Sequence, residues 1–361
     1  MATTAEYGLG PLAYPRGWFM IAIADDLTTA PQPVHFFGKE MALYRGKGSG
    51  RPILLDAFCP HMRVHMARNT TSYVVKDGIQ VEGDSLRCPA HGWRYNAQGK
   101  CDDIPYSNHG IPKAACVTSY TVVEKAGCIW MWHDMEGGEP DFDLPAFAEW
   151  DRENVGWVRW KPDHLGTLPI HPQEILDNMA DVAHFVPVHG SLGNVYFENT
   201  YEDHIMRQRF GAGHRTLVDT TALLETDTWY TGPGILLSRM SGKHPSVMMI
   251  CNTPVKDGEV RVWFAVMSQT ADNHQPTREE QAIARAYHEA GLAAFAQDFE
   301  LWQYKEPAIT VLQIPDDGPF HKGRIWYRQF YNPRDKVREI QQRVNGSHVT
   351  LRGKGEVREV A

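Results

Sequence analysis

Four residues in two short loops constrain the fold of this chain more than any other feature. The first loop is Cys59-Pro60-His61 and the second is Cys88-Pro89-Ala90-His91, so each loop supplies one cysteine and one histidine. Two thiolates and two imidazoles suit either tetrahedral zinc or a 2Fe-2S cluster with both thiolates on one iron and both imidazoles on the other. Common zinc fingers place both cysteines before both histidines, whereas the two residue types alternate here. The order therefore favours the cluster.

The residues around these loops have the pattern of a small all-β domain. Short apolar runs are separated by glycine turns, as at 34–37 and 41–45 on either side of Gly38. A stretch rich in Gly, Pro and acidic residues follows, and it predicts a linker over 136–147. We therefore expect residues 1–135 to form the first domain, including a short N-terminal extension.

The second domain, residues 148–361, mixes helix and strand signals. Apolar residues at helical spacing predict a helix over 172–184, and Thr277 to Lys305 predicts the longest helix, with a proline beyond each end. Strand-like runs lie between these two helices, at 205–210, 216–224, 235–240, 247–251 and 260–267. This order predicts an α+β fold with an antiparallel sheet that carries helices.

Charge and apolar content exclude several classes of function. The chain has 36 Lys and Arg against 44 Asp and Glu, a formal net charge of -8, which argues against binding nucleic acid or anionic lipid. The most apolar early stretch, 18–24, is short, so we expect neither a signal peptide nor a membrane span. We therefore expect a cytoplasmic protein whose six cysteines are thiols or metal ligands rather than disulfides.

A second group of candidate metal ligands lies near the end of the first predicted helix. His184 and His189 are five residues apart, and Pro187 between them ends the helix and lets the second imidazole fold back. Two such histidines and one carboxylate make the facial triad that holds Fe(II) and leaves positions open for O2 and substrate. Two histidines at a helix end can equally be structural.

Both groups of residues resemble those of the Rieske non-heme iron oxygenases. The two loops followed by Gly92-Trp93-Arg94-Tyr95 look like the Rieske domain of that family, and residues 178–189 match its Asn-x-x-Asp-x-x-His-x4-His pattern. The resemblance implies one 2Fe-2S cluster and one mononuclear non-heme Fe(II) per chain. Its implied cluster ligands are Cys59, His61, Cys88 and His91, and two of its implied iron ligands are His184 and His189.

The resemblance also implies a third iron ligand and an electron bridge. The family places an aspartate shortly before a tryptophan, which selects Asp298 ahead of Trp302 and leaves Glu300 outside the ligand set. Asp181 is implied to link an iron histidine to His91 across a subunit boundary and to carry the electron path. Such a bridge implies a ring-shaped oligomer, a homotrimer.

One segment departs from the family. The stretch between His61 and Cys88 is longer than usual, and its excess falls at 69–84, where the pattern predicts an inserted hairpin. His65 is a rival imidazole for the cluster, but it lies outside the Cys-x-His spacing. We therefore expect the ligand loops themselves to be undisturbed.

Within the family, the chain most resembles the 3-ketosteroid 9α-hydroxylase branch. The similar motifs are Cys59-Pro60-His61-Met62, Gly99-Lys100-Cys101, Ile104-Pro105-Tyr106, Asp317-Gly318-Pro319 and Gln329-Phe330-Tyr331. The resemblance implies a terminal oxygenase that monooxygenates a C–H bond of a small apolar substrate, with ring hydroxylation of a 3-ketosteroid as the first hypothesis. Electrons from NADH would arrive through a separate flavin and iron–sulfur reductase or a ferredoxin. No Gly-x-Gly-x-x-Gly fingerprint follows a strand, so the reductase is expected on another chain.

The substrate pocket and the exact reaction are less constrained. The family's helix-grip (START-like) domain encloses substrate between its sheet and its long helix. Apolar or aromatic candidates for the pocket wall are Met179, Val186, Tyr196, Phe197, Leu236, Met248 and Trp263. The alternatives are oxidative N- or O-dealkylation of an aromatic amide, amine or ether, a Rieske electron carrier that needs only the first domain, and a lipid-binding helix-grip protein that needs only the second.

Overall fold

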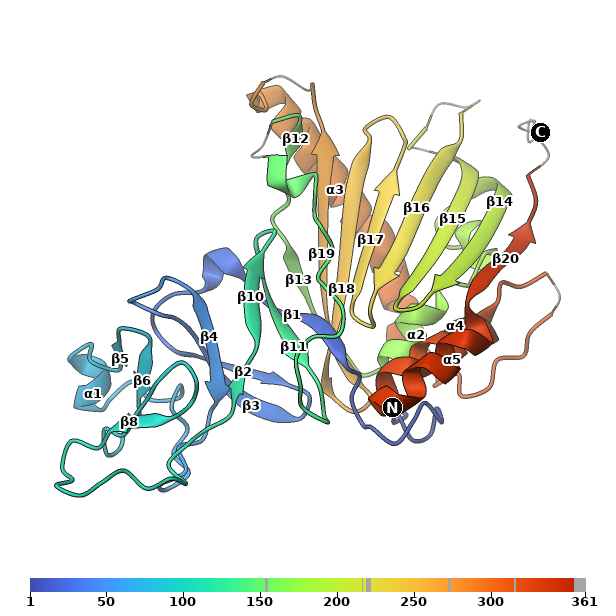
Figure 1. The fold of residues 1–361 in the computed structure, drawn as a ribbon. Helices are drawn as coiled ribbons and strands as arrows, with labels where there is room; N and C mark the ends of the chain where they lie inside the picture. The colour runs from blue at the N-terminus through green and yellow to red at the C-terminus, as the bar shows by residue number, and fades with distance from the viewer. Residues whose placement is uncertain (153–154, 216, 219–221, 272–273, 315, 354–361) are drawn as a thin grey trace. The chain divides into compact units, whose positions relative to one another are not determined.

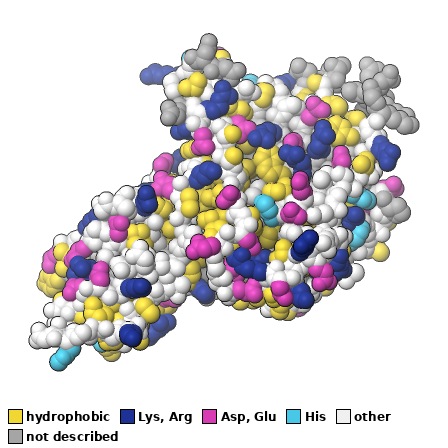
Figure 2. Space-filling model, in the orientation of Figure 1, with side chains coloured by type: hydrophobic (Ala, Val, Ile, Leu, Met, Phe, Trp, Pro, Cys, Tyr) yellow, Lys and Arg dark blue, Asp and Glu magenta, His cyan; other side chains and the backbone are white. Residues whose placement is uncertain are grey.

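The computed structural model describes residues 1–152, 155–215, 217–218, 222–271, 274–314 and 316–353 (Figure 1). The chain forms two compact units: Phe19–His133 is one, and Met1–Trp18 together with Asp134–Ala361 is the other. Among the described residues, no helix combines the length and apolar character needed to cross a membrane. On the face of the molecule in Figure 2, basic side chains are interspersed with acidic ones.

The smaller unit is built of three small antiparallel sheets, and the all-β prediction for this region is confirmed. Their strands are β1 (Gly17–Ile23), β11 (Cys128–His133) and β10 (Val122–Lys125); β2 (Gln32–Phe36), β3 (Lys39–Arg45), β4 (Pro52–Asp56) and β9 (Ser119–Tyr120); and β5 (Val81–Glu82), β6 (Ser85–Arg87), β7 (Arg94–Tyr95) and β8 (Cys101–Asp103). One core cluster joins the last two sheets, and it includes both Cys59 and Cys88. The two ligand loops therefore start from a buried core cluster.

The inserted segment 69–84 is not the predicted hairpin. Its first half forms a short helix, α1 (Tyr73–Lys76), and only its end forms a strand, β5. This strand pairs with β6, which follows the segment in sequence. The hairpin prediction was wrong because the side chain of Asn69 accepts the backbone N–H groups of Thr71 and Ser72 and starts a helical turn there. This local hydrogen bonding outweighs the β-propensity of the two valines in α1.

The larger unit is a nine-stranded sheet with helices, so the α+β prediction is confirmed. Its strands are β12 (Trp157–Val158), β13 (Asp163–Leu168), β14 (Ser191–Glu202), β15 (Ile205–His214), β16 (Leu224–Thr231), β17 (Ile235–Met240), β18 (Ser246–Lys256), β19 (Glu259–Gln269) and β20 (Gly346–Leu351). The long helix α3 (Arg278–Tyr304) crosses one face of the sheet (Figure 1). Three shorter helices accompany it: α2 (Pro172–Asp177), α4 (Phe320–Arg328) and α5 (Val337–Val344).

Helix α3 lies where the sequence predicted it because its start is strongly specified. Thr277 and Glu280 form a capping box, in which each side chain accepts the other residue's backbone N–H. Phe295 and Trp302 of the helix enter the core, and the Phe295 ring stacks on Phe264 of β19 at 5.7 Å between centroids. This packing anchors α3 on the sheet.

Two other predictions for this unit need correction. The helix predicted over 172–184 ends at Asp177, and the chain turns before one 3-10 turn at Ala183–Phe185. The carboxylate of Asp181 accepts the N–H groups of Ala183 and His184, which starts this new turn. Part of the strand predicted over 216–224 lies outside the described residues, and β16 begins only at Leu224.

The first eighteen residues, expected as an extension of the first domain, pack within the larger unit. Tyr7 is buried in its core and its hydroxyl hydrogen-bonds Glu174 of α2. Thr4 donates its backbone N–H to Asp257 at 2.7 Å and its hydroxyl lies 3.1 Å from Nε2 of His171. Because Tyr7 and its neighbours bury side chains there, this segment helps to fix the start of α2.

Candidate functional site

The two cysteine–histidine loops have the same backbone design. Each cysteine carbonyl accepts a hydrogen bond from four residues ahead, at 2.8 Å from Arg63 to Cys59 and at 3.0 Å from Gly92 to Cys88. Arg63 and Gly92 both have a positive φ, 56° and 76°, so both loops turn back at equivalent places. Local backbone hydrogen bonds of the same kind therefore close both loops.

The four side chains of these loops form two layers. The two cysteines are 1% exposed, while His61 and His91 are exposed with their ring centroids 4.7 Å apart. A hydrogen bond from Cys88 lowers the pKa of the Cys59 thiol to about 6, although burial opposes this, and the Tyr95 hydroxyl lies 3.1 Å from the same sulfur. The same contact raises the pKa of the Cys88 thiol. Two buried sulfurs on one side and two exposed imidazoles on the other fit the two differently ligated irons of a Rieske cluster.

Trp93 and His65 lie near the four loop residues and help to show which imidazoles belong to the cluster site. Trp93 stacks on His61 at 4.5 Å and donates its indole N–H to the Tyr106 hydroxyl at 2.8 Å. The rival imidazole, His65, has other partners: its Nε2 lies 3.4 Å from Glu40, and its Nδ1 accepts the N–H of Ala67 at 3.1 Å. The structure thus holds His65 apart from the four loop ligands.

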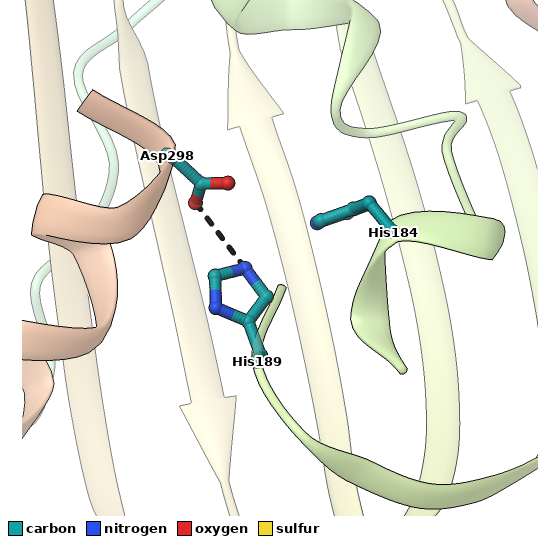
Figure 3. A group of neighbouring side chains, drawn as sticks. All are labelled: His184, His189 and Asp298. Carbon is teal, nitrogen blue, oxygen red and sulfur yellow. Dashed lines mark ion pairs between the residues drawn. The ribbon is translucent and has the colours of Figure 1, made fainter. Parts of the chain in front are cut away.

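His184, His189 and Asp298 come together in the larger unit (Figure 3). His184 lies in the 3-10 turn, His189 follows that turn and Asp298 lies on α3. One potential ligand atom of each residue lies within 4.8 Å of the other two, and Nε2 of His189 is 3.3 Å from the Asp298 carboxylate. Two imidazoles and one carboxylate on one side of a site form a donor set that suits Fe(II).

Hydrogen bonds set the orientation of both imidazoles. Nδ1 of His184 lies 2.7 Å from the backbone carbonyl of Asp181, and Nδ1 of His189 lies 3.2 Å from Oε1 of Gln297. Because both acceptors require a proton on Nδ1, Nε2 is the atom that each ring can offer to a metal, and in His189 it lies beside the Asp298 carboxylate. Burial acts to lower the pKa of His189, but the Asp298 carboxylate outweighs it and the pKa is raised.

Three side-chain amides hold the turn that carries His184: Asn199 and Gln208 are buried, and Asn194 is half-buried. Asn199 donates to the carbonyl of Met179 at 2.6 Å, and Gln208 donates to the same carbonyl at 3.1 Å. Asn194 donates to the carbonyl of Val182 at 2.8 Å. These carbonyls lose their helical partners where α2 ends, so the amides on β14 and β15 satisfy them.

Sequence reasoning missed these supporting residues. Asn199 lies two residues from each of Phe197 and Tyr201 and shares their buried face of β14, a strand that the sequence analysis did not predict. Gln297 had no signal beyond its place next to Asp298. Glu300 is exposed and does not join the group of ligands.

An apolar cavity of about 250 Å³ adjoins the two histidines and the aspartate. It lies between the sheet and one face of α3, whose lining residues recur at helical spacing: Tyr287, Ala290, Gly291, Ala294, Phe295, Asp298 and Trp302. Of the pocket candidates from sequence, Met179, Leu236 and Met248 line it. The cavity lies between the sheet and the long helix, where the substrate pocket was expected.

The other four pocket candidates lie elsewhere. Val186 is exposed, and Phe197 packs in a separate core cluster beneath the histidine segment. Tyr196 and Trp263 each precede a residue of the inner face, so strand alternation directs both to the opposite face of the sheet. There the Tyr196 hydroxyl bonds Glu225 at 3.1 Å.

Comparison with known proteins agrees with this geometry. Residues 17–121 match the Rieske [2Fe-2S] domain, and residues 131–331 match the 3-Ketosteroid 9alpha-hydroxylase C-terminal domain. A 3-ketosteroid-9-alpha-monooxygenase oxygenase component of Rhodococcus rhodochrous is 30% identical and covers 90% of this chain and 85% of its own. The one from Mycobacterium tuberculosis is 28% identical over 90% of this chain and 84% of its own.

Solved structures show the same fold. The NdmA protein of Pseudomonas putida CBB5 with caffeine has a TM-score of 0.66 at 16% identity, covering 92% of this chain and 95% of that one. Dicamba monooxygenase with non-heme iron and dicamba has a TM-score of 0.58 at 17% identity, covering 91% of this chain and 97% of that one.

The Rieske loops in one unit and the helix-covered sheet in the other define a Rieske-type oxygenase, an oxidoreductase with an iron–sulfur cluster. Because both parts match, neither an electron carrier nor a lipid-binding domain accounts for the whole chain. The chain belongs to the 3-ketosteroid 9α-hydroxylase family, and the prediction of a monooxygenase oxygenase component is confirmed.

Proposed function

We propose that this chain hydroxylates a ring C–H bond of a 3-ketosteroid or a closely similar apolar ketone, as the terminal oxygenase of a multi-component system. The observation that carries the proposal is the group of His184, His189 and Asp298 on the wall of an apolar cavity. The names of the relatives support the steroid as substrate class, and they describe each relative as an oxygenase component.

The residues present fit two metal groups. Cys59, His61, Cys88 and His91 would hold the 2Fe-2S cluster, and His184, His189 and Asp298 would hold a mononuclear iron. When bound, the cluster supplies single electrons and the iron supplies oxygen-atom insertion from O2. The Asp181 carbonyl and the Gln297 side chain hold Nδ1 of the two imidazoles, so that Nε2 of each ring would be the atom that binds the metal.

The cavity residues bind and orient the substrate. The face of α3 contributes small residues, Ala290, Gly291 and Ala294, opposite the sheet, which leaves room for a flat apolar ring system. Apolar side chains on both walls exclude water and hold one C–H bond beside the histidines.

Asp181 is proposed as the bridge to His91 of a second subunit in a homotrimer. Its backbone carbonyl already holds His184, while its carboxylate is 29% exposed and lies 3.6 Å from Nδ1 of the same ring. A carboxylate in this position can accept a further N–H bond from outside the chain. Electrons would come from a separate NADH-dependent reductase or a ferredoxin.

A single turnover tests the proposal. The metal-loaded protein is reduced chemically, freed of reductant and mixed with O2 and a set of 3-ketosteroids, neutral aryl ethers and N-alkyl amides. We expect mass spectrometry to find a steroid that has gained one oxygen atom, and no product with the Asp298→Ala variant. Loss of an alkyl group from an ether or amide, with the steroids unchanged, would contradict steroid hydroxylation and make the chain a dealkylase.

A further inference from the structure

A row of polar side chains crosses the apolar floor of the cavity. The strand pairing places Gln208 of β15, Thr228 of β16, Ser238 of β17 and Met248 of β18 side by side, and all four line the cavity. The lining residues in the row on one side are the apolar Leu236 and Ile250. The row on the other side holds Thr226 and Met240, so the floor is polar from this row towards Thr226 and apolar towards Leu236.

Thr228 and Ser238 in this row are hydrogen-bonded to each other. Their hydroxyl oxygens are 2.7 Å apart, and the two residues are 7% and 1% exposed. Each hydroxyl has one O–H donor, and the hydrogen bond between them occupies only one of the two donors. Among the described residues, neither hydroxyl makes a further side-chain hydrogen bond, so one O–H remains for a ligand at the cavity wall.

This pair lies across the sheet from the histidines. The segment with His184 lies over β15, because the Phe185 ring stacks on Phe210 at 4.1 Å and Gln208 bonds the Met179 carbonyl. Ser238 is two strands farther, and neighbouring strands are about 4.8 Å apart, so it lies about 10 Å across the sheet from Gln208. A molecule that fills this distance has its apolar body between the metal ligands and the hydroxyl pair.

We propose that the Thr228–Ser238 hydroxyl pair donates a hydrogen bond to a carbonyl oxygen of the substrate, and so selects which C–H bond faces His184, His189 and Asp298. The pair suits a neutral acceptor, because no Lys or Arg side chain lines the cavity among the described residues. This inference rests on the proposed function, since it names the group by which that site recognises its substrate.

Matched ligands and variants test the pair. Dissociation constants for the metal-loaded protein are measured with androst-4-en-3-one against androst-4-ene, and with androstan-17-one against androstane. In one of these two ligand pairs, we expect Thr228→Val and Ser238→Ala each to raise the dissociation constant of the ketone about tenfold, or about 1.4 kcal/mol. The dissociation constant of the matching hydrocarbon should stay unchanged. Retained hydrocarbon binding shows that each variant has folded. Thr226→Val, in the next row of the same cavity, is the control and should affect ketone and hydrocarbon equally.

The outcomes separate this inference from the proposed function. If the wild-type protein hydroxylates the steroid ketone but both variants bind ketone and hydrocarbon as it does, the hydroxyl pair is not the anchor and the function stands. Equal losses for ketone and hydrocarbon would also overturn the inference. If the wild-type protein neither binds nor oxidises any of these ketones, the function and the inference both fail. A shift in the position of the new hydroxyl group in Ser238→Ala would support the inference further.

Discussion

The two candidate metal sites of this protein are built in different ways. The four cluster ligands lie on two loops of the same design, and each loop is closed by its own backbone hydrogen bonds. His184, His189 and Asp298 instead come from a broken helix and from α3, and amides on β14 and β15 hold the broken helix. The first site therefore depends on local structure, whereas the second depends on how distant elements pack.

The largest expected effect is the loss of the mononuclear iron with the 2Fe-2S cluster retained. Asp298→Ala removes the only carboxylate of the group that holds the mononuclear iron. We expect the iron content to fall from about three to about two per chain, and turnover to fall at least about 10³-fold, while the visible spectrum of the cluster is unchanged. Glu300→Gln, on the exposed side of α3, is the control and should keep both. A changed cluster spectrum in Asp298→Ala would contradict the independence of the two sites.

A smaller effect concerns the start of α2, the element that leads to His184. Burial lowers the pKa of His171 to about 3, so below pH 6.5 the unfolded chain binds a proton that the folded chain does not. This contribution to stability is complete above pH 6.5 and is lost as the pH falls towards 3. At pH 5 the loss is about 2 kcal/mol.

His171→Asn tests this pH dependence, because asparagine can still cap α2 by accepting the N–H of Gln173 but does not titrate. We expect the wild-type protein to lose about 2 kcal/mol more of its free energy of unfolding than this variant between pH 7.5 and pH 5. Urea unfolding followed by circular dichroism measures it. Equal losses in both proteins would show that His171 is not the cause.

A tenfold effect is expected from the support of His189. Gln297→Leu removes the acceptor at Nδ1 of His189 without touching a ligand atom. We expect iron to bind the larger unit about tenfold more weakly, because the ring loses its set orientation and tautomer. Competition with a chelator measures this, and Gln297→Glu, which keeps an acceptor, should restore the affinity. If Leu and Glu behave alike, Gln297 does not position the ring.

The smallest expected effect lies in the cluster loops. Arg63 has a φ of 56°, which costs an L-residue more than glycine, so Arg63→Gly should raise the stability of the smaller unit by about 0.5–1 kcal/mol. Gly92→Ala is the reverse change at the equivalent place, where a Cβ would also meet Pro105 at 3.0 Å, and it should destabilise the unit. Thermal unfolding of the cluster-loaded protein checks both. Changes of the same sign would contradict the shared design of the loops.

The sequence predictions were accurate where local signals determine the structure and failed where other interactions outweigh them. The all-β character of the first region, the strands from Ile235 to Met267 and helix α3 were predictable, because apolar runs, turn residues and the prolines beyond both ends of α3 are local signals. The helix predicted over 172–184 begins at Pro172 as expected but ends early, at Asp177, and the hairpin predicted over 69–84 was wrong. In both segments side-chain hydrogen bonds to the backbone outweigh propensity.

By itself, the sequence determined which residues could hold the cluster and which histidine pair could hold iron, because each loop and the histidine pair span only a few residues and short spacing limits their geometry. Only the tertiary structure decided that Gln297 and Asn199 support the histidines, that Tyr7 joins the larger unit and that Thr228 and Ser238 meet in the cavity. These contacts join residues from separate elements. They depend on strand register and on the packing of α3 against the sheet, which no local pattern encodes.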